Sequence, residues 1–145
     1  MVKFVNDIKN YLQSVLTEAD AGVTVRDYIP DGEPADDTVY VSSASLKTDK
    51  QYESFDLTTA AQAEIDFRTV TKTSETGSAE ERNERCIGAL QSAFGGGAAP
   101  AWNTSVLRTD ITAFESPHPI SDADERYESA VRVQFTFLMP YAALK

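Results

Sequence analysis

One histidine and one cysteine are the most chemically versatile side chains of this 145-residue sequence. His118 stands between Pro117 and Pro119, whereas a catalytic histidine needs an orienting carboxylate and a nucleophile within reach. No serine occupies a Gly-x-Ser-x-Gly elbow. We therefore expect His118 to be a surface or turn residue. Cys86 has no partner for a disulfide and falls on the apolar side of a predicted helix, which indicates a buried structural thiol.

Acidic pairs and a glycine run are the other features that could hold a ligand. Asp36 and Asp37 lack the regularly spaced oxygen ligands of a calcium loop, and Asp122 and Asp124 are best explained as two scattered acids. The glycines at 95–97 follow a helix, whereas a phosphate-binding glycine loop follows a strand and opens a helix. We therefore expect no metal site, no cofactor and no catalytic residue, which argues against an enzyme.

Composition is that of a globular domain with an acidic surface. The net charge is −10, from 13 basic and 23 acidic residues, and hydrophobic residues make up 41%. Such a surface repels phosphate backbones and anionic lipid, so we expect no specific nucleic-acid binding and no membrane contact. No apolar run approaches the ~20 residues that a membrane span needs. The N-terminus lacks a signal-peptide pattern, which indicates a protein made in the cytoplasm.

The sequence predicts two amphipathic helices that pack against the other elements of the fold. The first covers 2–18, with Gly22 expected to end it in a left-handed turn. The second begins at Ser78, which forms a capping box with Glu81. We expect Gly88 inside this helix to mark a close approach to another backbone. The apolar stripe of the second helix is Cys86, Ile87, Leu90, Ala93 and Phe94, and its expected solvated face is Glu80, Glu81, Arg82, Glu84 and Arg85.

Five strands complete the expected fold. The last one has the clearest alternation, with Val131, Val133, Phe135 and Phe137 on one face, and Pro140 marks its end. The turn residues at 30–34 predict an antiparallel hairpin between the first two strands. The expected strands are 23–29, 38–46, 62–70, 105–114 and 127–141, separated by a long excursion at 47–61 and a loop at 115–126.

These elements predict a single α+β domain over 1–145, ordered α-β-β-β-α-β-β, with about five mostly antiparallel strands. The two helices could lie on one side of the sheet or on opposite sides. Small side chains in the second strand and charged ones on the third leave part of the sheet poorly covered. We therefore expect copies of the chain to complete the sheet by oligomerisation.

This layout, closing on the strand Arg-Val-Gln-Phe-Thr-Phe at 132–137, resembles the tail terminator (tail completion) proteins of tailed bacteriophages. They belong to the lambda-type minor tail family and related neck proteins. The resemblance implies a non-enzymatic virion protein of the tail or neck, assembled in the host cytoplasm. It further implies a homohexameric ring that caps the tail tube protein, stops its polymerisation and offers a docking surface to the head-closure or connector protein.

In such a ring, DNA passes through the lumen without specific binding, past a total charge of about −60 (6 × −10). We place the ring contacts in the 47–61 excursion, at Trp102 and in the 115–126 loop. The expected interface residues are Tyr52, Phe55, Leu57, Trp102, His118, Asp122, Asp124 and Arg126.

Three other functions stay open at this point. The chain could be a different ring protein of the same particle, either a head-closure protein or a tail tube protein. It could also be a soluble binding module that uses the 47–61 segment, or a small enzyme. The ring number, the host, the type of tail and the face that meets tube or head are not encoded in any recognisable pattern.

Overall fold

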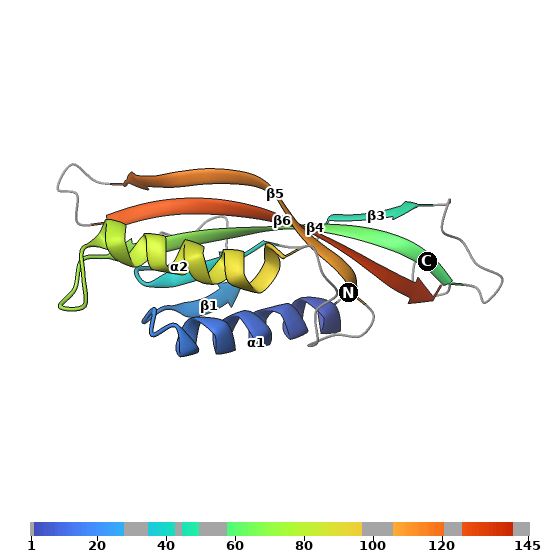
Figure 1. Cartoon of the computed structure of the whole chain (residues 1–145), viewed down its shortest axis with the longest axis horizontal. Helices are drawn as coiled ribbons and strands as arrows, with labels where there is room; N and C mark the ends of the chain where they lie inside the picture. The colour runs from blue at the N-terminus through green and yellow to red at the C-terminus, as the bar shows by residue number, and fades with distance from the viewer. Residues whose placement is uncertain are drawn as a thin grey trace.

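The computed structural model describes residues 2–27, 35–42, 45–49, 58–96, 106–120 and 126–140. It shows an α+β fold in which two helices pack on a mostly antiparallel sheet, which confirms the predicted class and order (Figure 1). The second expected strand divides into two short ones, β2 and β3. The elements are α1 (Val2–Glu18), β1 (Thr24–Asp27), β2 (Thr38–Val41), β3 (Ser45–Asp49), β4 (Thr58–Lys72), α2 (Ala79–Phe94), β5 (Val106–Pro119) and β6 (Arg126–Pro140).

The predicted hairpin between the first two strands is wrong. β1 and β2 run parallel, with Thr24 opposite Thr38 and Asp27 opposite Val41. A parallel pair needs a connection that returns to the start of the first strand. Strands of four residues are only about 13 Å long, so the ten residues between Asp27 and Thr38 are enough chain for that return.

Three long strands, β4, β6 and β5, form the centre and one side of the sheet, in the order β1-β2-β4-β6-β5. β4 and β6 are antiparallel over their whole length, and β6 is antiparallel to β5. β5 continues to Pro119, so the expected 115–126 loop is shorter than predicted. Pro117 and Pro119 are tolerated because β5 is an edge strand, whose outward groups need no ladder partner.

The expected excursion at 47–61 is also shorter than predicted. β3 pairs with β4, with Ser45 opposite Glu64 and Asp49 opposite Ala60. The pairing extends strand structure into both ends of the segment that lacked a clear period in the sequence. Tyr52, Phe55 and Leu57 lie outside the described residues.

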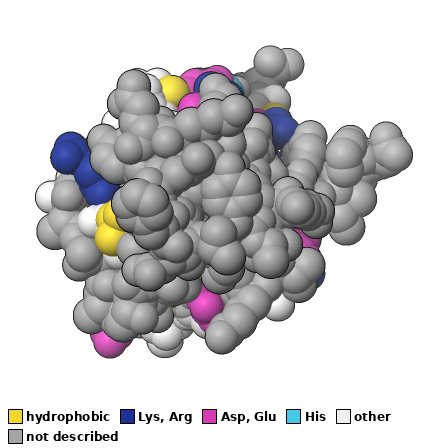
Figure 2. All heavy atoms as spheres, turned by 90° about the vertical axis from the view of Figure 1, so that its right-hand side faces the viewer, with side chains coloured by type: hydrophobic (Ala, Val, Ile, Leu, Met, Phe, Trp, Pro, Cys, Tyr) yellow, Lys and Arg dark blue, Asp and Glu magenta, His cyan; other side chains and the backbone are white. Residues whose placement is uncertain are grey.

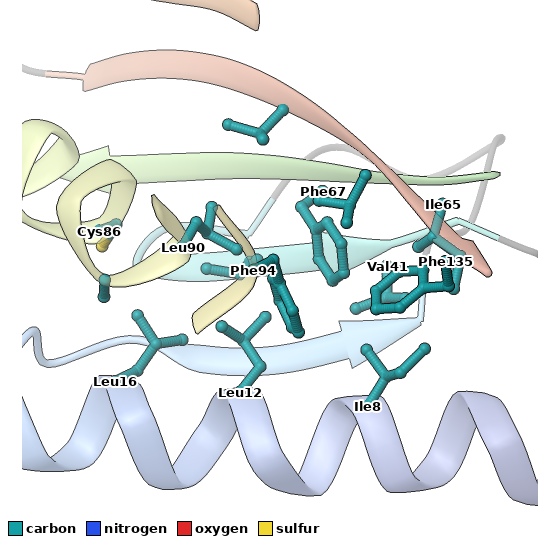
Figure 3. Packing of buried hydrophobic residues seen from close by; sticks show 14 of the residues in the cluster. Ile8, Leu12, Leu16, Val41, Ile65, Phe67, Cys86, Leu90, Phe94 and Phe135 are labelled. Atoms are coloured by element: carbon teal, nitrogen blue, oxygen red, sulfur yellow. The ribbon is translucent and has the colours of Figure 1, made fainter. Parts of the chain in front are cut away.

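The hydrophobic core lies between the sheet and both helices, which therefore share one face of the sheet (Figure 3). Phe94 of α2 stacks on Phe67 of β4 at a ring-centroid distance of 5.3 Å, and Phe135 of β6 meets it edge-on at 5.4 Å. Ring pairs at these separations are favourable beyond the area they bury. The buried side chains of α1 in this cluster follow the predicted helical spacing: Ile8, Leu12 and Leu16.

Helix α1 ends at Glu18 as predicted, but the residue in the left-handed conformation that terminates it is not the predicted one. The amide of Ala21 donates to the carbonyl of Leu16 and that of Asp20 to Thr17, which is the Schellman arrangement. Asp20, with φ 56°, holds the left-handed position that was expected at Gly22. Gly22 is a second left-handed residue, with φ 68°, where an added Cβ would lie 3.2 Å from an Arg82 nitrogen.

Helix α2 begins at Ser78, whose side chain accepts from the Glu81 amide as predicted, but its expected solvated face is wrong at one residue. Arg82 is only 4% exposed. Its guanidinium donates to Asp37 and to the backbone carbonyls of Lys72 and Gly22. These bonds tie α2 to the end of β4, the turn after α1 and the segment before β2.

A second buried polar residue of α2, Asn83, stands beside Arg82. Its amide nitrogen donates to the carbonyls of Thr69 and Tyr127 and to the hydroxyl of Thr71, and its oxygen accepts from Ser129. Buried amides that are fully partnered specify one packing arrangement. Asn83 therefore fixes α2 against β4 and β6.

Candidate interaction surfaces

The outer side of β5, here called the open edge, is the first candidate surface. Among the described residues, β5 pairs with β6 alone. In the described part of the chain, the exposed large hydrophobic side chains are Leu107, Phe114 and Ile120, at 43%, 52% and 38% exposure. Leu107 and Phe114 lie on β5, and Ile120 follows its last residue directly. An unpaired edge with exposed apolar side chains is a template for a further strand.

The sheet face opposite the helices, here called the helix-free face, is the second candidate surface. It carries charged side chains that alternate with the core residues of β4 and β6. Arg68 pairs with Glu128, and Arg132 holds both carboxylate oxygens of Asp66, at 2.8 and 3.4 Å. The hydrogen bond and charge of Asp66 raise the pKa of Arg132. These cross-strand ion pairs make the helix-free face a polar surface.

A hollow of about 680 Å³ lies on the helix-free face. The ion pairs of β4 and β6 form its floor. Tyr40 and Ser42 border it near β2, and Glu115 and His118 border it on β5. It therefore spans the sheet from β2 to β5.

The side chains around the hollow do not form an acid–base–nucleophile set. The Ser42 hydroxyl accepts from the Asp66 amide, and the carboxylates of the floor are paired with arginines. His118 lies 3.1 Å from the Ser116 carbonyl and 3.6 Å from a Glu115 carboxylate oxygen. Among the described residues that line the hollow, no nucleophile is placed against the imidazole.

Cys86 is fully buried against the core, as the sequence predicts. Burial raises the pKa of its thiol from 9.0 to about 12. The thiol is therefore neutral and shielded at physiological pH, and it is not a nucleophile.

In the described part of the chain, no three His, Cys, Asp or Glu side chains are grouped to hold a metal ion. No helix in that part is long and apolar enough to cross a membrane.

Of the predicted interface residues, His118 and Arg126 are described, and they lie at the same end of the β5–β6 pair. His118 is opposite Glu128, and the amide of Ile120 donates to the Arg126 carbonyl at 3.0 Å. The Arg126 guanidinium also pairs with Asp36, ahead of β2. The remaining predicted residues lie outside the described residues: Tyr52, Phe55, Leu57, Trp102, Asp122 and Asp124.

Sequence reasoning missed the open edge itself. The signal was present as poor alternation in the fourth strand, where β-bulges shift the pattern between Val106 and Arg108, between Ile111 and Ala113 and between Glu115 and His118. These shifts bring apolar residues to the surface at irregular spacing. Figure 2 shows the end of the molecule that carries β3, where the visible described side chains are scattered around the rim.

Comparisons with known proteins find similarity among solved structures. No protein-family model matches the chain, and no curated protein matches it. A chain in the solved structure of the virion of a native gene transfer agent (GTA) particle is similar, with a TM-score of 0.48 and 15% sequence identity. The match covers 87% of this chain and 84% of that chain.

Proposed function

We propose that this chain is a structural, non-enzymatic protein of a phage-like virion, located in the tail or neck. In this proposal six copies close into a ring that caps the tail tube, stops its polymerisation and presents the surface on which the head docks. Its partners are further copies of the chain, the tail tube protein and the head-closure or connector protein. Assembly takes place in the host cytoplasm.

The observation that carries the proposal is the open edge. Within the described residues the sheet ends in β5 on one side and in β1 and β3 on the other. A head-to-tail ring needs two different, complementary surfaces on each subunit, and a sheet with two unlike edges supplies such a pair. The exposed Phe114 and Leu107 provide apolar area for that contact. The sequence layout, which resembles tail terminator proteins, supplies the specific role.

Charge supports the expected passage of DNA. Each subunit contributes −10, so a ring of six repels a phosphate backbone instead of holding it. On the helix-free face the arginines Arg68 and Arg132 are already paired with carboxylates. They offer few free cations to a passing strand.

Native mass spectrometry of the purified protein, alone and mixed with the tail tube protein encoded by the same genome, tests the proposal. We expect a six-subunit species that increases in the presence of tubes, and electron microscopy should show it at one tube end. Long polymers of the protein alone would instead identify a tube protein. Binding to the head connector without binding to tubes would identify a head-closure protein.

The hollow on the helix-free face favours a second candidate function, a binding module. Tyr40 and His118 at its borders, with the ion pairs between them, could receive a polar segment of another protein. A chain that stays monomeric at every concentration, with or without tubes, would favour this function over the ring.

A further inference from the structure

We propose that the open edge of a free subunit pairs antiparallel with the open edge of a second copy, about a two-fold axis between Ile111 and Thr112. This inference deepens the proposed function, because it names an earlier partner of the same edge. Only the biological role of the dimer depends on the proposed ring. The pairing itself follows from the residues of β5.

The β-bulge in the middle of β5, between Ile111 and Ala113, places matching side chains on the same face of the sheet in this register. Opposite residues of an antiparallel pair point to the same face of the sheet, and a two-fold axis through the sheet preserves that face. Arg108 and Asp110 stand opposite Thr136 and Gln134, on the helix-free face. After the bulge, Ala113 and Glu115 stand on that face too, opposite Arg132 and Ala130. The extra residue at the bulge thus lets the two halves of β5 match each other.

In this register the two copies are complementary in charge. Arg108 of each subunit, which pairs with Asp110 of its own strand at 2.7 Å, lies opposite Glu115 of the other, so the contact brings a second carboxylate to each arginine. Opposite charges directly across an antiparallel pair stabilise it, and like charges destabilise it. Sliding the register by two residues in one direction would set Asp110 against Glu115, two carboxylates, and in the other direction would set Arg108 against Ala113, which loses the opposite charges. The charge pattern therefore selects the two-fold arrangement centred on the bulge.

Apolar contacts support the same register. Phe114 faces Thr109 of the second copy, and these positions stand opposite Val131 and Phe135 on the core face of the sheet. Phe114 is 52% exposed in the single subunit, so it has apolar area left to bury. Phe114 of each copy would be covered by the edge of the other.

The ends of β5 limit the contact to two chains. Pro117 and Pro119 cannot donate ladder hydrogen bonds, which confines pairing to the residues before them. The proline-free part, 106–116, is centred on Ile111, beside the proposed axis. A two-fold contact uses the same edge on both partners and leaves neither copy with a free β5 edge. The dimer therefore keeps the edge covered until assembly requires it.

Charge-swap variants test the register. Arg108→Glu and Glu115→Arg should each raise the dimer dissociation constant about tenfold or more, because each creates two like-charge contacts. The double variant Arg108→Glu/Glu115→Arg restores opposite charges across the contact and should lower the dissociation constant again, short of the wild-type value because the Arg108–Asp110 pair within each strand is lost. Arg26→Glu makes the same charge change on exposed β1 and serves as the matched control. Analytical ultracentrifugation over about 1 to 200 µM gives the constants.

A spin label at Thr112→Cys tests the geometry independently of affinity. The native Cys86 is buried, so only the introduced thiol reacts in the folded protein. Because adjacent strands lie about 4.8 Å apart, two labels beside the axis should be about 20 Å apart or less. A label at Arg26→Cys, on the far edge, should give a much longer distance or none.

The results separate this inference from the ring. A monomer throughout the concentration range, a dimer that the charge swap does not rescue, or distant labels at 112 would overturn the two-fold pairing. A hexamer on tubes would still stand in each of those cases. A rescued dimer with close labels but no ring on tubes would confirm the pairing and contradict the proposed function.

Discussion

Replacing Phe114 with alanine tests whether this side chain belongs to an assembly surface or to the hydrophobic core. The side chain is 52% exposed at the open edge, whereas Phe94 is fully buried among aromatic rings. A phenylalanine side chain buries roughly 200 Å² when fully covered, so about 100 Å² remains for a partner to cover. At about 25 cal/mol per Å², the contact would lose up to about 2.5 kcal/mol per subunit.

The same substitution should cost the isolated subunit less than a core truncation does. Phe94→Ala opens a cavity and should lower the free energy of unfolding by about 3–5 kcal/mol. Phe114→Ala should lower it by no more than about half of that, because half of the side chain is already in water. Phe114→Leu keeps most of the apolar area and serves as the matched control, with association close to wild type.

Denaturant unfolding at low protein concentration measures the stability term, and sedimentation of the folded protein measures association. We expect Phe114→Ala to remain folded and to associate at least about 10-fold more weakly. Unchanged association would refute the assignment of Phe114 to an assembly surface. A loss of stability as large as that of Phe94→Ala would show that Phe114 belongs to the core.

Three further predictions concern the fold. Gly88→Ala should raise the free energy of unfolding by about 1 kcal/mol in thermal melts, since Gly88 is an exposed helix-interior residue with nothing within 4 Å of an added Cβ; destabilisation would reveal a contact there. Asn83→Ala should lower the free energy of unfolding by about 2–4 kcal/mol, because it removes the four hydrogen bonds of this amide, and a neutral result would contradict the role of this network. Folding raises the pKa of Cys86 from 9.0 to about 12. The contribution of this thiol to the free energy of unfolding is therefore complete below pH 9 and is lost as the pH rises from 9.0 to about 12. Cys86→Ala should therefore lose less stability over that range in alkaline denaturation, and identical pH profiles would refute this.

The elements that sequence reasoning located well are those with strong local signals. α1 and α2 were predicted with their observed starts and ends, because apolar periodicity and the Ser78 cap are local features. β6 was predicted because its alternation is regular from Val131 to Phe137. The expected close backbone approach at Gly88 was wrong, because the residue faces open space.

The parts that sequence reasoning missed depend on neighbours distant along the chain. The turn residues at 30–34 predicted a hairpin, but the pairing direction of β1 and β2 is set by how both fit the sheet. The prolines after Ser116 indicated a loop, although an edge strand can hold them. Arg82 was assigned to water since it sits in a charged run, and only the fold brings Asp37 and two carbonyls to it.

Hydrogen–deuterium exchange of the β5 amides as a function of protein concentration tests most directly whether the chain completes its sheet with copies of itself. We predict that residues 107–116 gain protection as association proceeds, and again when tail tubes are added, whereas Phe114→Ala shifts the gain to higher concentration. Association that leaves exchange at β5 unchanged would contradict the account.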